Sequence, residues 1–184
     1  MDNSRSIFLI GPMGVGKSTI GRMLASQLDM PFFDSDREIE FVTGADIPWI
    51  FDVEGEPGFR AREARMIDTL TQRSGIILAT GGGAILAPES RCNLHERGVV
   101  VYLRASIAQQ FERTSKDKTR PLLQTANPLV RIKELIKIRE PLYRETAHVI
   151  IDTSRRGPRS VSAEIIKQLD ALQQTPVEEQ DDKA

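Results

Sequence analysis

A glycine-rich loop from Gly11 to Ser18 is the segment whose residue types and spacing are best suited to chemistry. It reads Gly-Pro-Met-Gly-Val-Gly-Lys-Ser and matches the pattern G-x-x-x-x-G-K-[ST] at every fixed position. In such a loop successive backbone N–H groups point into one concavity, and glycine permits the unusual φ/ψ values that this requires. The Lys17 amine can reach the β- and γ-phosphates of a nucleotide, and the Ser18 hydroxyl can ligate Mg²⁺. The spacing therefore predicts a nucleoside triphosphate site.

Two carboxylates follow in the stretch Phe33-Asp34-Ser35-Asp36. Ligands of open α/β sheets bind outside the carboxyl ends of the strands, and alternate residues of an extended segment point the same way. Asp34 and Asp36 can therefore face one cleft, where one orients or deprotonates an attacking hydroxyl and the other holds a water of the Mg²⁺ shell. Taken alone, the same residues fit a helix N-cap better, with Ser35 or Asp36 capping a helix that begins near Arg37.

Three consecutive glycines and three arginines are the remaining candidates for an acceptor site. Gly81-Gly82-Gly83 favours a close approach of backbone and ligand, although a tight turn would also use one or two of these glycines. Arg60 and Glu63 lie three residues apart, so Glu63 can hold Arg60 in place on a helix. Arg120 and Arg139 precede proline-containing stretches. Each arginine alone fits a solvated surface charge, whereas together their planar guanidiniums suit capture of a carboxylate or phosphate.

The elements that must position these residues alternate along the chain. Five short apolar runs are typical of strands covered on both faces, and they span residues 6–10, 31–34, 76–79, 99–103 and 148–151. Helical periodicity is carried by Ile20, Met23, Leu24 and Leu28, by Met66, Ile67 and Leu70, by Ile132, Leu135, Ile136 and Ile138, and by Val161, Ile165, Ile166 and Leu169. This alternation predicts an α/β fold with a parallel sheet and right-handed crossovers.

The 184-residue chain has the length of one domain, which we place at residues 1–174. Residues 113–128 are polar and without period, as expected of a mobile loop. Residues 175–184 are acidic and poor in apolar residues, which predicts a disordered tail.

Composition excludes several classes of protein. Net charge is −1, so no global charge steers the protein to nucleic acid or to an anionic membrane. The single cysteine, Cys92, can form neither an internal disulfide nor a zinc site, and a small, partly buried side chain is its simplest interpretation. The apolar run at residues 7–10 is too short for a signal segment or a membrane span. We therefore expect a cytoplasmic protein without a membrane or nucleic-acid partner.

The class of P-loop protein can also be narrowed. A guanine-specific [NT]-K-x-D motif is missing, and the D-x-x-G string at residues 52–55 follows no expected strand. The strand at residues 76–79 leads into glycines rather than into the paired acids of a motor ATPase. A small-molecule kinase remains, in which much of the chain serves the acceptor.

In combination these motifs resemble the shikimate kinase family over about residues 6–173. The matching pieces, which occur in the family's order, are GPMGVGKS, FDSD at 33–36, TG at 43–44, WIF at 49–51, EGE at 54–56, Phe59-Arg60, Glu63, GGG at 81–83, RPLL at 120–123 and Arg139 with PLY at 141–143. The loop alone is shared by many families, but the ordered set is specific. No position that matters for chemistry departs from the pattern.

The resemblance implies a three-layer α/β/α P-loop kinase with a five-stranded parallel sheet, shikimate-binding helices over about residues 34–63 and a mobile lid over about 113–125. It implies transfer of the γ-phosphoryl group of ATP to the 3-hydroxyl of shikimate, giving shikimate 3-phosphate and ADP in aromatic amino-acid biosynthesis. Mg²⁺ is the implied cofactor, and a monomer is the expected state. The open alternatives are a P-loop kinase for another acceptor such as gluconate, and a nucleotide-binding module without enzymatic activity.

The resemblance also assigns roles to residues of this sequence. The implied catalytic residues are Asp36, Lys17 and Arg120, and the implied metal contacts are Ser18 directly and Asp34 through water. The implied ATP-binding residues are Gly11, Met13, Gly14, Val15, Gly16, Lys17, Ser18, Thr19, Arg113, Arg120, Arg156 and Pro158. The implied shikimate-binding residues are Asp36, Phe51, Phe59, Arg60, Glu63, Gly81, Gly82, Gly83 and Arg139, with Arg60 and Arg139 clamping the carboxylate.

Overall fold

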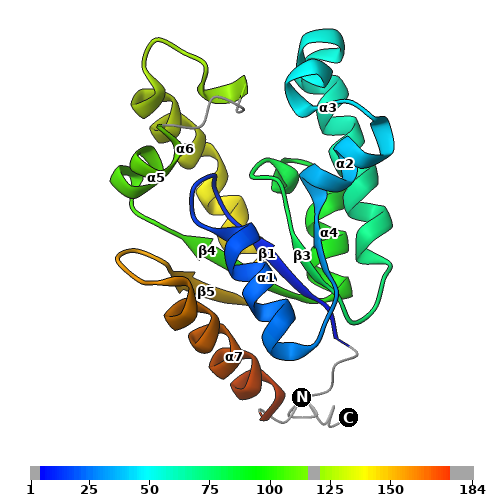
Figure 1. Ribbon diagram of the computed structural model, residues 1–184, viewed down its shortest axis with the longest axis vertical. Helices are drawn as coiled ribbons and strands as arrows, with labels where there is room; N and C mark the ends of the chain where they lie inside the picture. Colours follow the sequence, from blue (N-terminus) through cyan, green and yellow to red (C-terminus); the bar gives the residue numbers. More distant parts are fainter. Residues whose placement is uncertain (1–4, 116–120, 175–184) are drawn as a thin grey trace, which may run out of the picture.

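A parallel sheet forms the centre of the molecule (Figure 1). The computed structural model describes residues 5–115 and 121–174. Within these residues the sheet has five strands, β1 (Ile7–Ile10), β2 (Phe32–Asp34), β3 (Ile77–Ala79), β4 (Val99–Arg104) and β5 (Val149–Asp152). They lie in the order β2-β3-β1-β4-β5 and every neighbouring pair is parallel. The five runs predicted as strands are thereby confirmed.

Helices cover both faces of this sheet. They are α1 (Lys17–Leu28), α2 (Ser35–Thr43), α3 (Ile47–Thr71), α4 (Pro88–Arg97), α5 (Ile107–Thr114), α6 (Pro128–Thr146) and α7 (Pro158–Gln174), with short 3₁₀ helices at Ala84–Leu86 and Pro121–Leu123. Side chains of β1 alternate between two cores. Ile7 and Leu9 pack with residues of α1 and α7, whereas Phe8 and Ile10 pack with residues of α3, α4 and α6. The predicted three-layer α/β/α architecture is confirmed.

The four predicted helical periodicities fall in α1, α3, α6 and α7. One residue of the α6 pattern differs from the prediction, because Ile138 is 61% exposed. The buried stripe of α6 runs through Ile132, Leu135, Arg139 and Tyr143 instead. A charged residue therefore occupies a core position that the apolar pattern assigned to its neighbour.

Helix α3 is bent at Gly55, whose φ of 70° and ψ of 178° lie outside the helical region. This left-handed φ favours glycine, and Pro57 lies two residues after it. The D-x-x-G string at residues 52–55 thus belongs to a kinked helix, in agreement with its interpretation as a coincidence.

The segment predicted to be irregular from residue 113 contains regular structure. Arg113 lies in the last turn of α5, and residues 121–123 form a 3₁₀ helix. Residues 116–120 of the expected lid, including Arg120, and the acidic residues 175–184 lie outside the described residues.

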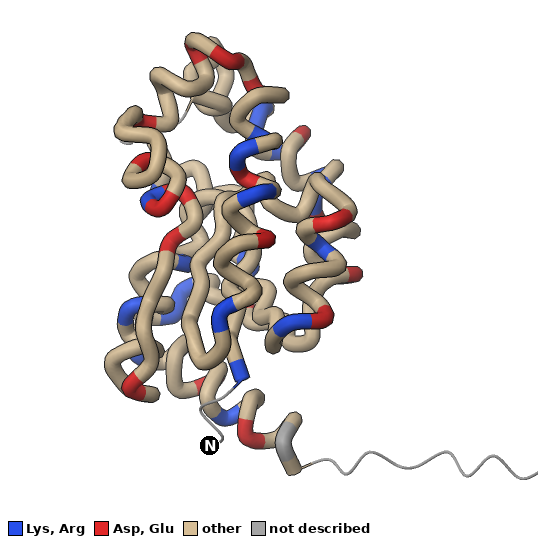
Figure 2. Tube along the Cα trace, turned by 90° about the vertical axis from the view of Figure 1, so that its right-hand side faces the viewer, with Lys and Arg blue, Asp and Glu red and all other residues tan. Residues whose placement is uncertain are grey.

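Two pairs of helices stand above the carboxyl ends of the strands, α2 with α3 on one side and α5 with α6 on the other (Figure 1). Basic and acidic positions are interspersed along the side of the molecule drawn in Figure 2, as the net charge of −1 leads one to expect. Among the described helices, none is long and apolar enough to cross a membrane.

Two histidines stack at the opposite end of the sheet. The ring centroids of His95 and His148 lie 4.2 Å apart, and the angle between the ring planes is 17°. The backbone N–H of Val100 donates to His148 Nδ1 at 3.0 Å, and the backbone N–H of His148 donates to the Val100 carbonyl at 2.9 Å. Burial, the neighbouring His95 and Arg5 lower the pKa of His148 below its usual value. Folding therefore favours the neutral ring, because only an unprotonated Nδ1 accepts from Val100.

This arrangement predicts a loss of stability in mild acid. The unfolded chain takes up a proton at His148 near pH 6.5, before the folded chain does, so the contribution of the neutral ring is complete above that pH and is lost as pH falls through the lower pKa of the folded state. The His148→Asn variant keeps an acceptor and removes the titration. Urea unfolding at pH 7.5 and 5.5 is expected to show a larger loss for the wild type than for the variant, and equal losses would contradict the prediction.

Candidate active site

The phosphate-binding loop joins β1 to α1. Three of its glycines have positive φ, 139° at Gly11, 77° at Gly14 and 96° at Gly16. A Cβ at Gly11 would also overlap the carbonyl oxygen of Leu103 at the end of β4. The Lys17 amine donates to the carbonyl oxygens of Gly11 at 2.7 Å and Pro12 at 2.8 Å. Both acceptors belong to the phosphate-binding loop, so the loop itself holds the amine.

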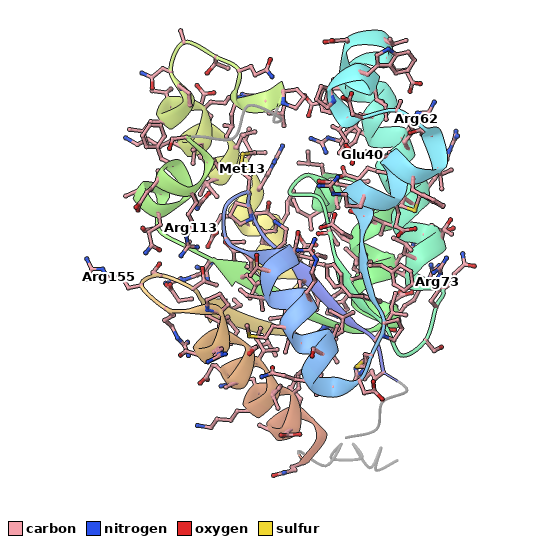
Figure 3. The ribbon with its side chains drawn as sticks, in the orientation of Figure 1. Met13, Glu40, Arg62, Arg73, Arg113 and Arg155 are labelled. Atoms are coloured by element: carbon pink, nitrogen blue, oxygen red, sulfur yellow. The ribbon has the colours of Figure 1, made fainter. Side chains whose placement is uncertain are left out.

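Helix α5 supports this loop from one side. A Cβ at Gly14 would approach Thr114 Cγ2 to 3.0 Å and the Gln110 carbonyl to 3.1 Å, so the helix packs directly on the glycine. Arg113 donates to the Gly14 carbonyl at 3.1 Å. Figure 3 shows Met13 at the tip of the loop, between Arg113 on α5 and Glu40 on α2. The position of the loop is thus tied to that of α5.

Asp34 links the end of β2 to the start of α1. Its Oδ2 accepts from the Ser18 hydroxyl at 2.6 Å. Its Oδ1 accepts from the backbone N–H groups of Asp36 at 3.2 Å and Arg37 at 3.5 Å, which makes Asp34 the N-cap of α2. The cap expected at Ser35 or Asp36 is therefore provided by Asp34, and the Ser35 hydroxyl accepts from the Gly81 N–H at 2.8 Å instead.

Asp36 lies in the first turn of α2, not on an extended segment as predicted. It nevertheless lines the same cavity as Asp34, because the helix begins directly after the strand. The N-terminal end of a helix favours a negative charge. A Cβ at Gly81 would come within 2.7 Å of Asp36 Oδ1 and would overlap Glu63 Oε1. Both carboxylates therefore approach the backbone of Gly81.

Glu63 is a buried acid held by Arg60. Its side chain is 2% exposed, and Arg60 Nη1 lies 2.5 Å from its Oε2. A second ion pair joins Arg60 Nη2 to Glu56 Oε1 at 3.0 Å. Burial raises the pKa of Glu63 although Arg60 opposes this. Burial alone would lower the pKa of Arg60, but Glu63 and Glu56 outweigh it and raise that pKa. The structure thus confirms the predicted contact between Arg60 and Glu63.

Arg139 is the contrasting arginine. It is 4% exposed, and its Nη1 donates to the Gly82 carbonyl at 3.3 Å. No ion pair joins it to a carboxylate within the described residues. Burial lowers its pKa, and the nearby charge of Arg60 adds to this effect. The guanidinium stays charged at neutral pH. A buried cation without a carboxylate partner is costly, so the site favours an anionic ligand.

One cavity of about 390 Å³ collects most of the predicted acceptor residues. Its wall includes two phenylalanines, Phe51 and Phe59, whose ring centroids are 4.8 Å apart. The predicted residues on this wall are Met13, Ser18, Asp34, Asp36, Phe51, Phe59, Arg60, Glu63, Gly81, Gly82, Gly83 and Arg139. Residues from α1, α2, α3, α6 and the segment after β3 are thus brought together at one edge of the sheet.

A second cavity of about 310 Å³ lies on the other side of the loop. The predicted residues on its wall are Val15, Gly16, Thr19, Arg113, Arg156 and Pro158. Gly11, Gly14 and Lys17 belong to the loop that separates the two cavities and line neither of them. The loop therefore stands between a wall rich in carboxylates and arginines and a second wall near α5 and α7.

Several residues of the site were not identified from the sequence. Arg37, Glu40, Asp46, Ile47, Pro48, Pro121 and Leu122 also line the first cavity, and Ile20, Thr153 and Val161 line the second. Among these residues, only Pro121 and Leu122 were part of a sequence motif, the proline-containing stretch after Arg120. The others are placed by the kink of α3, by the packing of α2 on α3 and by the return of the chain after β5.

Comparison with known proteins decides the family. A family model described as shikimate kinase matches residues 13–170. The shikimate kinase of Pseudomonas fluorescens (strain Pf0-1) is 57% identical over 172 residues, which cover 94% of this chain and 98% of the relative. The chain belongs to the shikimate kinase family. The family members that it matches are ATP-dependent kinases, which confirms the enzyme class inferred from the loop.

Solved structures agree with this placement. The shikimate kinase of Acinetobacter baumannii in complex with shikimate gives a TM-score of 0.91 at 48% identity, covering 94% of this chain and 96% of that chain. A gluconokinase from Sinorhizobium meliloti 1021 gives a TM-score of 0.57 at 16% identity, covering 94% of this chain and 95% of that chain. This likeness shows the fold alone. The comparisons support the shikimate kinase interpretation and not the gluconate alternative.

Gly81 and Gly82, which follow β3, are expected to differ in how well they tolerate a methyl side chain. Overpacking against Glu63 and Asp36 costs about 1–3 kcal/mol, so Gly81→Ala should lower Tm by about 3–10 °C. A Cβ at Gly82 would be 3.6 Å from Met13 N and 3.8 Å from Arg139 Nη1, which is ordinary contact. Gly82→Ala is therefore the matched control and should keep the wild-type Tm while its methyl group narrows the cavity. Thermal unfolding of the two variants measures their Tm, and equal shifts would contradict the predicted difference between Gly81 and Gly82.

Proposed function

We propose that this protein transfers the γ-phosphoryl group of ATP to the 3-hydroxyl of shikimate, giving shikimate 3-phosphate and ADP. The observation that carries the proposal is the buried Arg139, which has no carboxylate partner in the described part of the chain and lines the same cavity as Asp36 and Ser18. A small acid with several hydroxyl groups complements this wall. Its carboxylate would neutralise Arg139, and its hydroxyls would meet Asp36.

The carboxylate of the acceptor would lie between Arg60 and Arg139. Arg60 is already oriented by Glu63 and Glu56, so its guanidinium can be shared with a ligand without being reoriented. Arg139 is held by the Gly82 carbonyl. A planar guanidinium offers paired donors to a carboxylate, and hydrogen bonds to charged groups contribute about 1.5–3 kcal/mol each. The two arginines would therefore fix one end of the acceptor.

Asp36 would orient the attacking hydroxyl or accept its proton, because it lines the cavity at the N-terminal end of α2, beside the loop. Phosphoryl transfer has a loose transition state with charge spread over oxygens, so alignment and electrostatic stabilisation supply most of the rate. Lys17 would exchange its bonds to the loop carbonyls for phosphate oxygens. Arg120, which lies outside the described residues, is proposed to add a second positive charge from a lid over about residues 113–125.

The Ser18–Asp34 pair suits Mg²⁺ that arrives with ATP. A hydroxyl and a carboxylate oxygen 2.6 Å apart are hard donors, and this ion typically keeps several waters and binds through one or two protein oxygens plus phosphates. Ser18 would hold it directly and Asp34 through a water. When bound, the ion neutralises charge on the β- and γ-phosphates. We propose the second cavity, with Arg113, Arg156 and Pro158, for the adenosine part of ATP.

The acceptor is tested by ADP production. Purified protein with Mg·ATP should release ADP at a rate that depends on shikimate, and phosphorus NMR should identify the 3-phosphate ester. A matched panel with gluconate and nucleoside monophosphates serves as control. Turnover of gluconate without turnover of shikimate would overturn the proposal, and ATP binding without turnover of any acceptor would favour a nucleotide-binding module. The monomeric state and cytoplasmic location stay predictions.

The carboxylate clamp is tested by removing one arginine at a time. Arg139→Met and Arg60→Met should each raise the KM for shikimate by about 10- to 100-fold, the equivalent of about 1.5–3 kcal/mol, with a nearly unchanged KM for ATP. Arg62→Met is the matched control, because Arg62 lies on α3 two residues from Arg60 but pairs with Glu54 at the exposed surface (Figure 3). Steady-state kinetics measure all three. Normal shikimate kinetics in both site variants would exclude the clamp.

A further inference from the structure

Tyr143 is a buried residue of α6 to which the proposed function gives no role. It lies one helical turn after Arg139 on the same face and is completely buried. Its hydroxyl donates to the Gly82 carbonyl at 2.6 Å. Arg139 Nη1 donates to the same carbonyl at 3.3 Å. The guanidinium of Arg139 and the phenol of Tyr143 therefore meet at one acceptor, the Gly82 carbonyl oxygen.

These two donors use the full capacity of the Gly82 carbonyl oxygen. A carbonyl oxygen has two lone pairs, and the two donors from α6 fill both. The Tyr143 hydroxyl has a single proton, which it donates to Gly82, so this bond holds the carbonyl oxygen to which Arg139 also donates. Since Arg139 forms no ion pair with a carboxylate among the described residues, the Gly82 carbonyl that Tyr143 also holds is the neutral group that orients its guanidinium.

The ring of Tyr143 is itself immobilised from the side of the sheet. It stacks on Tyr102 of β4, with centroids 4.9 Å apart and an angle of 17° between the rings. The Tyr102 hydroxyl donates to Glu140, and Glu140 pairs with Arg144 at 2.7 Å. Both tyrosines belong to the core between the sheet and helices α3, α4 and α6. The position of the Tyr143 hydroxyl is thus set by the rigid core.

We propose that Tyr143 is a positioning residue that transmits the rigidity of the core to Arg139, so that the guanidinium is oriented before the acceptor binds. Pre-orientation lowers the ordering cost of binding, because fewer side-chain rotamers remain to be fixed. The inference rests on the proposed function, since it assigns Arg139 to the carboxylate of the acceptor. It gives a specific task to the tyrosine of the Pro141-Leu142-Tyr143 stretch.

The first test is a matched pair of variants. Tyr143→Phe and Tyr102→Phe each remove one hydroxyl from the same stacked pair and keep the ring. Tyr143→Phe should raise the KM for shikimate by about 3- to 10-fold, the range of a neutral hydrogen bond, and leave the KM for ATP unchanged. Tyr102→Phe should leave both KM values unchanged, even where it lowers Tm. Equal kinetic effects of the two variants, or a fall in Tm alone, would overturn the positioning role.

A double-mutant cycle tests whether Tyr143 acts through Arg139. Lysine in place of Arg139 keeps the charge but lacks the planar fork whose Nη1 shares the Gly82 carbonyl with the phenol. In the Arg139→Lys background, Tyr143→Phe should therefore change the KM for shikimate by less than about twofold, because the two residues form one unit. The same 3- to 10-fold effect in both backgrounds would show that Tyr143 acts independently of Arg139 and would refute the inference.

The orientation of Arg139 can also be measured without substrate. Its Nε–Hε cross peak in NMR spectra, assigned by its loss in Arg139→Lys, should move toward the position of exposed arginines in Tyr143→Phe and stay in place in Tyr102→Phe. An unmoved peak in Tyr143→Phe contradicts the positioning role whatever the acceptor is. A moved peak in a protein that fails to phosphorylate shikimate contradicts the proposed function instead and leaves the positioning role standing.

Discussion

The buried ion pair between Arg60 and Glu63 is the interaction on which the geometry of the site depends. Removing one member of a buried pair leaves an uncompensated charge, and such changes typically cost about 3–5 kcal/mol. The pair also explains the glycines after β3. A Cβ at Gly83 would overlap the guanidinium of Arg60, and one at Gly81 would overlap the carboxylate of Glu63. The backbone after β3 can approach α3 only because both positions lack a side chain.

The two arginines of the cavity differ in a way that suits their proposed tasks. Arg60 has two carboxylate partners, whereas Arg139 donates to the Gly82 carbonyl, which Tyr143 also holds. A ligand carboxylate would therefore meet one guanidinium that is already ion-paired and one that forms no ion pair among the described residues. Burial shields the second from water, which strengthens its attraction for an anion. The attraction is concentrated at one end of the cavity, and in the proposed reaction this would orient the acceptor.

Much of this structure could be predicted because the signals are local. The apolar runs gave the strands, and the spacing of glycines with Lys17 and Ser18 gave the loop, since both depend on residues adjacent in the sequence. The prediction was wrong where a residue took an unexpected local role. Asp34 caps α2 while also binding Ser18, because one carboxylate oxygen is free for each task. Ile138 is exposed because the buried stripe of α6 continues through Arg139.

Other features depend on contacts between distant segments and could not be predicted. The three glycines line the first cavity, where a close approach to a ligand stays a prediction, but the sequence did not show that at Gly81 and Gly83 the missing side chain also makes room for side chains of α2 and α3. Tyr143 carries no sequence signal for its bond to Gly82, because 61 residues separate them. The packing of α5 on Gly14 is likewise visible only in the fold.

The location of the phosphoryl transfer follows from how the loop divides the space around it. Met13 and Ser18 face the cavity with the arginines, whereas Val15, Gly16 and Thr19 face the cavity beside α7. In the proposed reaction, a nucleotide whose phosphates occupy the loop and whose base lies beside α7 would have only its terminal phosphate left to enter the first cavity. Asp36 and Ser18 both line that cavity, so the acceptor hydroxyl and the metal-binding oxygens would meet the same phosphate. The loop would thus both hold the donor and separate it from every part of the acceptor except the reacting hydroxyl.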